Sequence, residues 1–201
     1  MFRKIVLGLM VLVVIVVGLW AYRTHEAVAR VESYKPQVQA ELAKSGLQGD
    51  TQLVLAIIYT ETKGGSADIM QSSESLYGKG GANAIASQTE SISQGVDELT
   101  SLIEYSNSKG CDVYTAVQAY NFGKAYIDYV AVHGKVTSVK LADAYSRTVV
   151  APSLGNKTGA TYRHLTWDSL FYNGGKLYVN GGNFFYAGEV HFNFDLLKIF
   201  G

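Results

Sequence analysis

The chain is poor in cysteine, proline and charge, and each shortage excludes a class of protein. Cys111 is the only cysteine among 201 residues. An intramolecular disulfide and paired-cysteine redox or zinc motifs are therefore excluded, and we expect Cys111 to be a small buried residue. The chain has only 2 prolines, which favours a helical protein over a loop-rich one. Charged residues make up 17% and hydrophobic residues 48%, a balance that suits a folded core and not a disordered chain.

Several common functional sites lack their sequence signals. The histidines, which are His25, His133, His164 and His191, do not have the spacing of paired metal ligands, so we predict no metal and no other cofactor. The glycine-rich residues 78–81 lack the other parts of a phosphate-binding loop. The formal net charge is zero, and Lys and Arg do not cluster beyond pairs. A nucleic-acid partner is therefore not expected.

One long apolar run is present near the N-terminus. Residues 5–22 carry no charge, and as a helix they would cover about 27 Å, close to the thickness of the hydrocarbon core of a membrane. Arg3 and Lys4 precede the run, so the positive-inside rule predicts a cytoplasmic tail at 1–4 and an exported domain. A cleaved signal peptide is the alternative, but its apolar region is usually shorter. We expect a retained single-pass anchor in the cell membrane.

The exported part is expected to form a linker at 23–34, or a continuation of the anchor helix, followed by one domain at 35–201. Apolar periodicity and capping residues predict helices that begin at Pro36, Asp50, Ser91, Asp112, Lys124 and Ser138. Residues 152–182 are loop-like, with hairpin turns expected at Asn173-Gly174 and Asn180-Gly181. Residues 183–200 form an aromatic helix or strand. The fold class is therefore mainly α.

Glu61 is the first candidate for chemistry. It lies near the end of the helix predicted at 51–62, whose apolar residues go nearly all round and indicate burial. A carboxylate there is destabilising unless it is neutralised, paired or used. Burial also raises the pKa of a carboxyl group, as a general acid near neutral pH requires. A side chain that points to solvent or pairs with Lys63 is the alternative.

Two later segments offer polar side chains. Residues 68–75 combine an amide with hydroxyls that can bond a sugar, and a methionine that can pack on a sugar face. The candidate ligands there are Met70, Gln71, Ser72 and Ser73. Residues 119–123 offer the phenol of Tyr120 and the amide of Asn121 at a helix end. Taken alone, residues 68–75 are better explained as a polar surface loop, and residues 119–123 by packing of Tyr120 in the core with Asn121 as a helix stop.

In this order the three elements resemble the lysozyme-like domains of Gram-positive bacteria, relatives of the goose-type lysozymes and soluble lytic transglycosylases. That superfamily has a catalytic Glu at a helix end, a Met-Gln loop, an Ala-Tyr-Asn-x-Gly motif and a later Tyr followed by Val. The later Tyr matches Tyr186, with Tyr162 and Tyr178 as alternatives. Thr62 departs from the Ser that many transglycosylases have after the Glu. The resemblance covers roughly residues 35–198 and implies a lysozyme-like fold.

The resemblance also implies a function. It predicts cleavage of the β-1,4 bond between N-acetylmuramic acid and N-acetylglucosamine in peptidoglycan glycan strands, with Glu61 as catalytic acid and Tyr186 among the substrate-binding residues. A lytic transglycosylase would use Glu61 alone. A hydrolytic muramidase would need a second carboxylate, for which Asp68 and Glu74 are the nearby candidates. A glycan-binding or division scaffold without activity is a third reading. The expected partners are glycan strands, the membrane, and cell-wall or division proteins at a Gram-positive cell surface.

Overall fold

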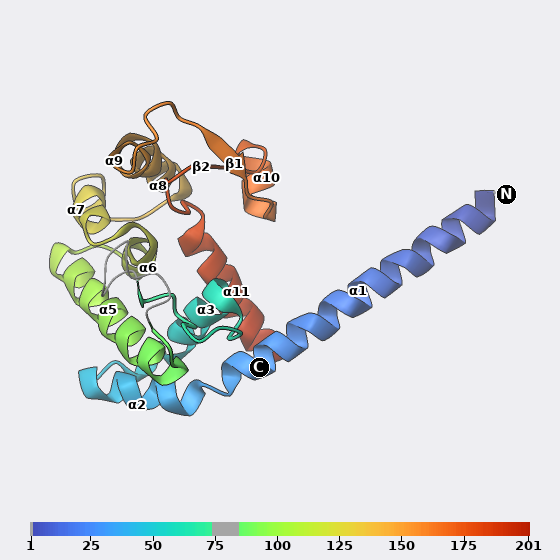
Figure 1. Cartoon of the computed structure of the whole chain (residues 1–201), viewed down its shortest axis with the longest axis horizontal. Helices are drawn as coiled ribbons and strands as arrows, with labels where there is room; N and C mark the ends of the chain where they lie inside the picture. Colours follow the sequence, from blue (N-terminus) through green and yellow to red (C-terminus); the bar gives the residue numbers. More distant parts are fainter. Residues whose placement is uncertain (1, 74–84) are drawn as a thin grey trace.

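The computed structural model describes residues 2–73 and 85–201, so Glu74 lies outside the described residues. The chain forms one long helix that projects from a mainly helical domain (Figure 1). The helices and strands are α1 Phe2–Glu32, α2 Lys35–Ser45, η1 Gln48–Asp50, α3 Thr51–Thr62, α5 Gln88–Lys109, α6 Val113–Phe122, α7 Ala125–Ala131, α8 Val139–Tyr145, the π-helical η3 Ser146–Val150, α9 Ala151–Ser153, β1 Thr161–Arg163, α10 Trp167–Asn173, β2 Lys176–Tyr178 and α11 Tyr186–Phe200. The mainly α fold expected from the sequence is confirmed.

Helix α3 is the centre of the domain. Residues 53–59 are all buried, as the apolar run predicted, and α1, α2 and α11 pack around them. The helix ends at the expected place, because Lys63 adopts a left-handed conformation (φ 53°) and donates its N–H to the carbonyl of Tyr59. Asp50 occupies the N-cap position but makes no side-chain capping bond. Burying this helix fixes the position of Glu61 in its last turn.

Helix α5 begins earlier than the sequence suggested. Ser87 is its N-cap and accepts a hydrogen bond from the N–H of Glu90 at 3.2 Å, so the prediction of a cap at Ser91 is wrong. Ser91 instead lies fully buried in the first turn, where its hydroxyl bonds to the loop that follows α3. Helix α5 then packs against α2, α6 and α7. The first turn of α5 therefore lies directly beside the loop that follows α3.

Residues 152–182 are more regular than expected. Strands β1 and β2 pair antiparallel, with Arg163 opposite Lys176, and α10 connects them in the sequence. A capping box of Thr166 and Ser169 starts α10. The hairpin turn predicted at Asn173-Gly174 is wrong, because Gly174 ends α10 in a left-handed conformation (φ 75°). This small unit lies next to the start of α11 (Figure 1).

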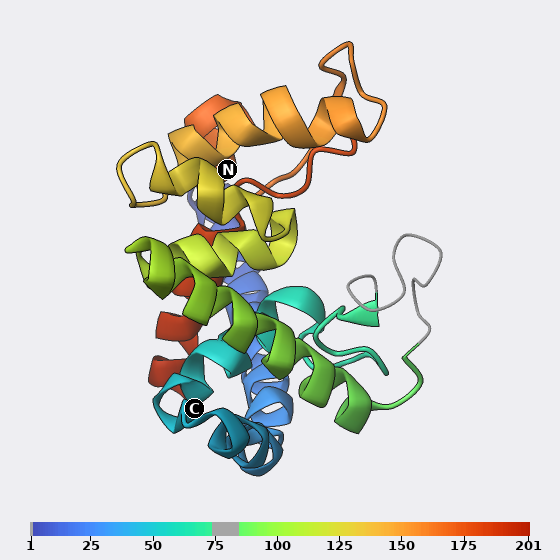
Figure 2. The same ribbon diagram turned by 90° about the vertical axis from the view of Figure 1, so that its left-hand side faces the viewer.

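Helix α1 continues without a break through residues 23–32. Within the described residues, it is the one helix long and apolar enough to cross a membrane. Its N-terminal part is exposed, whereas Thr24, Ala27, Val28 and Val31 are buried against the domain. The projecting part of α1 lies behind the domain in the view of Figure 2. Residues 23–34 therefore join α1 to the domain by packing and not by an extended segment.

Candidate functional site

Glu61 lies in the last turn of α3, and its carboxylate accepts a hydrogen bond from the Tyr186 hydroxyl on α11 at 2.5 Å. Burial raises the pKa of Glu61 from 4.5 to about 7, and the Tyr186 hydrogen bond acts against this rise. Smaller upward contributions to the same pKa come from the nearby carboxylates of Asp68, Glu189 and Glu98. A large fraction of Glu61 is therefore protonated near neutral pH, as a general acid requires.

Tyr120 and Tyr186 bring two phenols to this carboxyl group. Their rings stack with centroids 6.5 Å apart and an interplanar angle of 13°. The Tyr120 hydroxyl donates to the carbonyl of Met70 at 2.9 Å, so α6 is tied to the loop after α3. Burial raises the pKa of both hydroxyls well above 10. Both side chains therefore remain neutral hydrogen-bond donors at physiological pH.

Asp68 organises the loop after α3 from inside it. The residue is 2% exposed. Its carboxylate accepts hydrogen bonds from the backbone N–H groups of Ser72 and Ser73, both at 3.0 Å, and from the hydroxyls of Ser72, Ser73 and Ser91. Burial acts to raise the pKa of Asp68, but these hydrogen bonds outweigh it and hold the pKa below its ordinary value. Asp68 is thus a charged support for the loop.

Three of the predicted sugar ligands, Met70, Ser72 and Ser73, are buried and contact other parts of the protein. Ser72 and Ser73 are buried and bond to Asp68, so their hydroxyls face inward. Met70 is fully buried, and a Cβ added to Gly95 of α5 would lie 2.6 Å from its Sδ. The packing of Met70 on a sugar face is therefore not the arrangement found, because α5 already covers its side chain. Its backbone still matters, since its carbonyl holds Tyr120.

Gln71 is the exposed member of the loop. Its backbone is left-handed (φ 52°), and its side-chain Nε2 donates to the carbonyl of Asp68 at 3.0 Å. Its neighbours Asp68 to Met70 and Ser72 to Ser73 are buried, whereas Gln71 itself is exposed. Of the four candidate ligands in residues 68–75, Gln71 alone has an exposed side chain.

Asn121 ties α6 to the turn that precedes α11. Its Oδ1 accepts the N–H of Asn183 at 2.7 Å. The turn passes so close to Asn121 that a Cβ on Gly182 (φ 67°) would lie 2.9 Å from that oxygen. Asn121 is itself exposed. The side chain therefore fixes the approach of two elements and remains open to solvent.

The structure adds positioning residues that sequence analysis missed. Gln118 is buried in α6, where its Nε2 donates to the carbonyl of Asn183 at 2.9 Å and its Oε1 accepts the N–H of Ala187 at 3.1 Å. Glu189 bonds to Asn183 Nδ2 at 2.8 Å and to His164 Nε2 at 2.6 Å. These contacts fix the first turn of α11, which carries Tyr186. A buried-looking glutamine inside an apolar helix was the one available signal.

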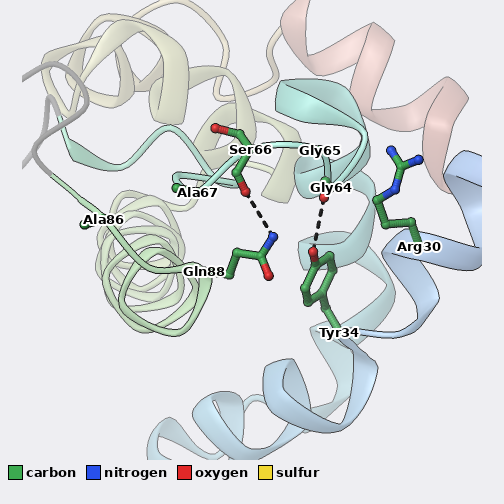
Figure 3. Close-up of a pocket in the computed structure, with 8 residues that line it drawn as sticks. All are labelled: Arg30, Tyr34, Gly64, Gly65, Ser66, Ala67, Ala86 and Gln88. Atoms are coloured by element: carbon green, nitrogen blue, oxygen red, sulfur yellow. Dashed lines mark hydrogen bonds between the residues drawn. The ribbon is translucent and has the colours of Figure 1, made fainter.

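A separate pocket lies between the junction of α1 and α2, residues 64–67 of the loop after α3, and the start of α5 (Figure 3). Its volume is about 590 Å³. It is lined by Arg30, Tyr34, Gly64, Gly65, Ser66, Ala67, Ala86 and Gln88. Tyr34 donates to the carbonyl of Gly64 at 3.1 Å across its wall. None of the predicted site residues lines this pocket. Within the described residues, no three His, Cys, Asp or Glu side chains gather as metal ligands.

Comparisons with known proteins identify the family and the fold. A family model for lysozyme-like domains matches residues 28–194. The chain is 46% identical over 200 residues to pneumococcal vaccine antigen A of Streptococcus pneumoniae serotype 4, which covers 100% of this chain and 97% of the relative. It is 32% identical over 126 residues to the bifunctional muramidase/DL-endopeptidase CwlT of Bacillus subtilis, covering 63% of this chain and 37% of that protein. A Staphylococcus aureus structure described as similar to an NLP/P60 family lipoprotein matches with a TM-score of 0.72 and 30% identity, over 82% of this chain and 52% of that one.

Proposed function

Because the chain belongs to the lysozyme-like family, we propose that it cleaves the β-1,4 bond between N-acetylmuramic acid and N-acetylglucosamine in peptidoglycan, with Glu61 as the proton donor. The observation that carries this proposal is the Glu61 carboxyl group itself. It is largely buried at a helix end, bonded to Tyr186, and its pKa is raised to about 7. A carboxyl group in that state suits general acid catalysis on a glycosidic oxygen.

The first chemical step is proton transfer from Glu61 to the glycosidic oxygen. The bond between that oxygen and C1 of the muramic acid breaks, and the shortened strand leaves with the proton. The Glu61 carboxylate that forms remains bonded to the Tyr186 hydroxyl, which stabilises its negative charge. In a lytic transglycosylase, this carboxylate then takes the proton of the muramic C6 hydroxyl. The C6 oxygen bonds to C1, and a 1,6-anhydro ring replaces water as the acceptor.

The single-carboxylate mechanism is our first choice. Asp68 is buried and bonded to three serines, and Glu189 is bonded to His164 and Asn183. In this arrangement, both carboxylates already serve to hold protein groups in place. This supports a mechanism in which Glu61 acts first as acid and then as base, without a second carboxylate that activates water.

A hydrolytic muramidase is the second candidate. The partial similarity to a protein named as a muramidase favours it, and Asp68 lies close enough to Glu61 to raise its pKa. In that mechanism, the loop after α3 would have to open before the Asp68 carboxylate could act on a water molecule. The two candidates therefore differ in the acceptor of the glycosyl group and in the role of Asp68.

We place this activity outside the cytoplasm. Helix α1 would cross the membrane once with residues 1–4 inside, because Arg3 and Lys4 precede its apolar run. The domain would then meet its glycan substrate on the outer side. Helix α1 carries the only such run within the described residues, which supports a single-pass anchor.

Mass spectrometry of the products tests the proposal. The full-length chain in detergent should release muropeptides with 1,6-anhydromuramic ends from purified cell wall. Reducing muramic ends in their place would select the muramidase mechanism. Intact glycan strands after incubation, or release of peptides alone, would contradict glycan cleavage.

A further inference from the structure

We propose that helix α10 carries a second membrane contact, an aromatic surface that rests on the bilayer into which α1 inserts. This surface, called the α10 surface below, consists of four residues. They are Leu165 (62% exposed), Trp167 (76%), Leu170 (45%) and Phe171 (85%). The proposal rests on the membrane anchor proposed above and not on the chemistry of Glu61. It assigns a lipid ligand to a part of the domain outside the candidate site.

The α10 surface is held rigidly with its aromatic side outward. Trp167 and Phe171 are four residues apart, so they share a helix face, and their rings stack with centroids 6.3 Å apart. The opposite face is fixed to the domain. Ser169 is buried and bonds to the carbonyl of His164, and the Tyr172 hydroxyl donates to Asp143 at 3.0 Å. The aromatic side chains are therefore exposed although the opposite face of the helix is bonded to the domain.

The position of the bilayer follows from the way α1 joins the domain. The buried side chains of α1 begin at Thr24, two residues after the apolar run ends at Tyr22. Near the end of α1, Arg30 donates to the carbonyl of Lys63 at 3.3 Å. The apolar run and these packed turns belong to one continuous helix, so no loop separates the anchor from the domain. The direction of α1 therefore determines which side of the domain faces the membrane.

Both views place α10 on that side. In Figure 1, α1 leaves the domain toward the right, where α10 also lies, while α5 and α7 lie at the left. In Figure 2, which looks from that left side, α10 and the N-terminus both lie at the back of the molecule. A bilayer around the apolar run of α1 therefore faces α10 and not α7.

The chemistry of the α10 surface suits the polar–apolar boundary of a bilayer. Trp and Phe are favoured at that depth, as is expected for Trp20 and Tyr22 on α1. Arg163 and Lys176 occupy opposite positions on the paired strands β1 and β2, beside α10. Both are exposed, so they can contact anionic headgroups. A glycan strand is the competing ligand. Exposures of 76% and 85% describe a protruding ridge, which suits a bilayer better than a sugar chain held in a cleft.

The chain offers a direct test, because Trp20 and Trp167 are its 2 tryptophans. In full-length protein with Trp20→Phe, Trp167 is the only tryptophan. In proteoliposomes, its fluorescence should be quenched by lipids brominated on their acyl chains and protected from aqueous acrylamide. The Trp167→Phe protein provides the reference for a tryptophan on the anchor. Free quenching by acrylamide without an effect of brominated lipids would overturn the proposal. Protection that appears only after glycan strands are added would also overturn it, in favour of a glycan site.

Matched variants locate the contact. In the Trp20→Phe background, Phe171→Glu should reduce quenching by brominated lipids several-fold, because it adds a charge to the α10 surface. Val132→Glu adds the same charge to an exposed residue (79%) beside α7 and should leave quenching unchanged. Equal losses in both variants would contradict a local contact. Cleavage of short soluble glycans should be the same in wild type and Phe171→Glu, so failure of the lipid contact is distinguishable from failure of the proposed glycosidase.

The two cations give a further arm to the same experiment. Quenching of Trp167 should increase when anionic phosphatidylglycerol is added to neutral vesicles. Arg163→Gln combined with Lys176→Gln should remove that increase and keep the quenching found in neutral vesicles. An increase that survives the double substitution would contradict the role of these two side chains in lipid contact.

Discussion

At the scale of single residues, the site centres on a carboxyl group in an environment that destabilises its charged form. Burial raises the pKa of Glu61 to about 7, and the hydroxyl of Tyr186 lowers it. The raised pKa of Glu61 affects two measurable quantities, which are the free energy of unfolding at high pH and the pH dependence of catalysis.

Glu61→Gln is expected to stabilise the folded protein at high pH. Because the folded-state pKa of Glu61 is raised from 4.5 to about 7, its stabilising contribution is complete below pH 4.5 and is lost as the pH rises through 7. The loss corresponds to roughly 3 kcal/mol. Glutamine stays neutral, so the variant should exceed wild type by up to about this amount at pH 8 and match it near pH 4. Urea unfolding at the two pH values measures the difference, and an equal effect at both would contradict it.

Tyr186→Phe is expected to move the high-pH limb of activity. Catalysis needs protonated Glu61, so kcat/KM of the wild type should fall as the pH rises through about 7. Loss of the Tyr186 hydroxyl removes a bond that favours the carboxylate, so the limb should shift to higher pH. Tyr120→Phe is the matched control, because its hydroxyl bonds to Met70 and not to Glu61. A limb that stays fixed or moves lower in Tyr186→Phe would contradict the assignment.

The residues of the site were only partly predictable from the sequence. Glu61, Tyr120 and Tyr186 follow from a motif order and meet in the structure. Gln118 and Glu189 did not stand out, because their partners lie elsewhere in the chain or in segments that looked irregular. Gln118, for example, bonds to the backbone of Asn183, 65 residues away. Motifs indicate groups that do chemistry, whereas positioning residues become visible only when the elements are packed.

At the scale of elements, the joint between α6 and α11 positions Tyr186, and Asn121 is its exposed part. Asn121→Ala should lower turnover and reduce the free energy of unfolding by about 1 kcal/mol, because the N–H of Asn183 loses its acceptor. Asn121→Asp keeps an oxygen at that position and should retain most activity if positioning is the role. Turnover assays with urea unfolding distinguish the cases. If Asn121→Asp were as inactive as Asn121→Ala, the amide N–H would be needed for substrate instead.

Element boundaries were predictable where local chemistry was unambiguous. Helix α3 begins and ends as expected, because an apolar run meets Lys63-Gly64-Gly65. The start of α5 was missed although Ser87 and Glu90 have the spacing of a capping box, a signal that Ser91 obscured. Helix α10 was missed because it has only 7 residues between two short strands. Its Thr166–Ser169 capping box is a weaker pattern than hydrophobic periodicity over several turns.

At the scale of the whole molecule, the end of the anchor helix is part of the domain core. A soluble fragment that begins at residue 24 keeps Ala27, Val28 and Val31, whereas one that begins at residue 35 loses them. Burial of a valine side chain contributes about 1.5–3 kcal/mol. The shorter fragment should therefore be less stable by at least about 3 kcal/mol. Urea unfolding of the two fragments checks this, and equal midpoints would show that α1 adds nothing to the core.

This packing gives the molecule a fixed orientation. The anchor, the loop after α3 and the carboxyl group of Glu61 are connected through short contacts, such as that between Arg30 and Lys63. With the α10 surface as a second contact, the domain would be held on the membrane at two points. Such an enzyme would cleave glycan strands only at a fixed distance from the bilayer.

The central claim is that Glu61 is the proton donor for glycan cleavage, and turnover of purified cell wall by Glu61→Gln tests it most directly. General acid catalysis contributes about 10²–10⁴-fold, so the variant should be at or near background. Its circular dichroism and its binding to cell wall should match wild type, since glutamine keeps the shape and the bond to Tyr186. Asp68→Asn, measured in parallel, should retain cleavage in the single-carboxylate mechanism. Near-normal cleavage by a folded Glu61→Gln protein would contradict the account.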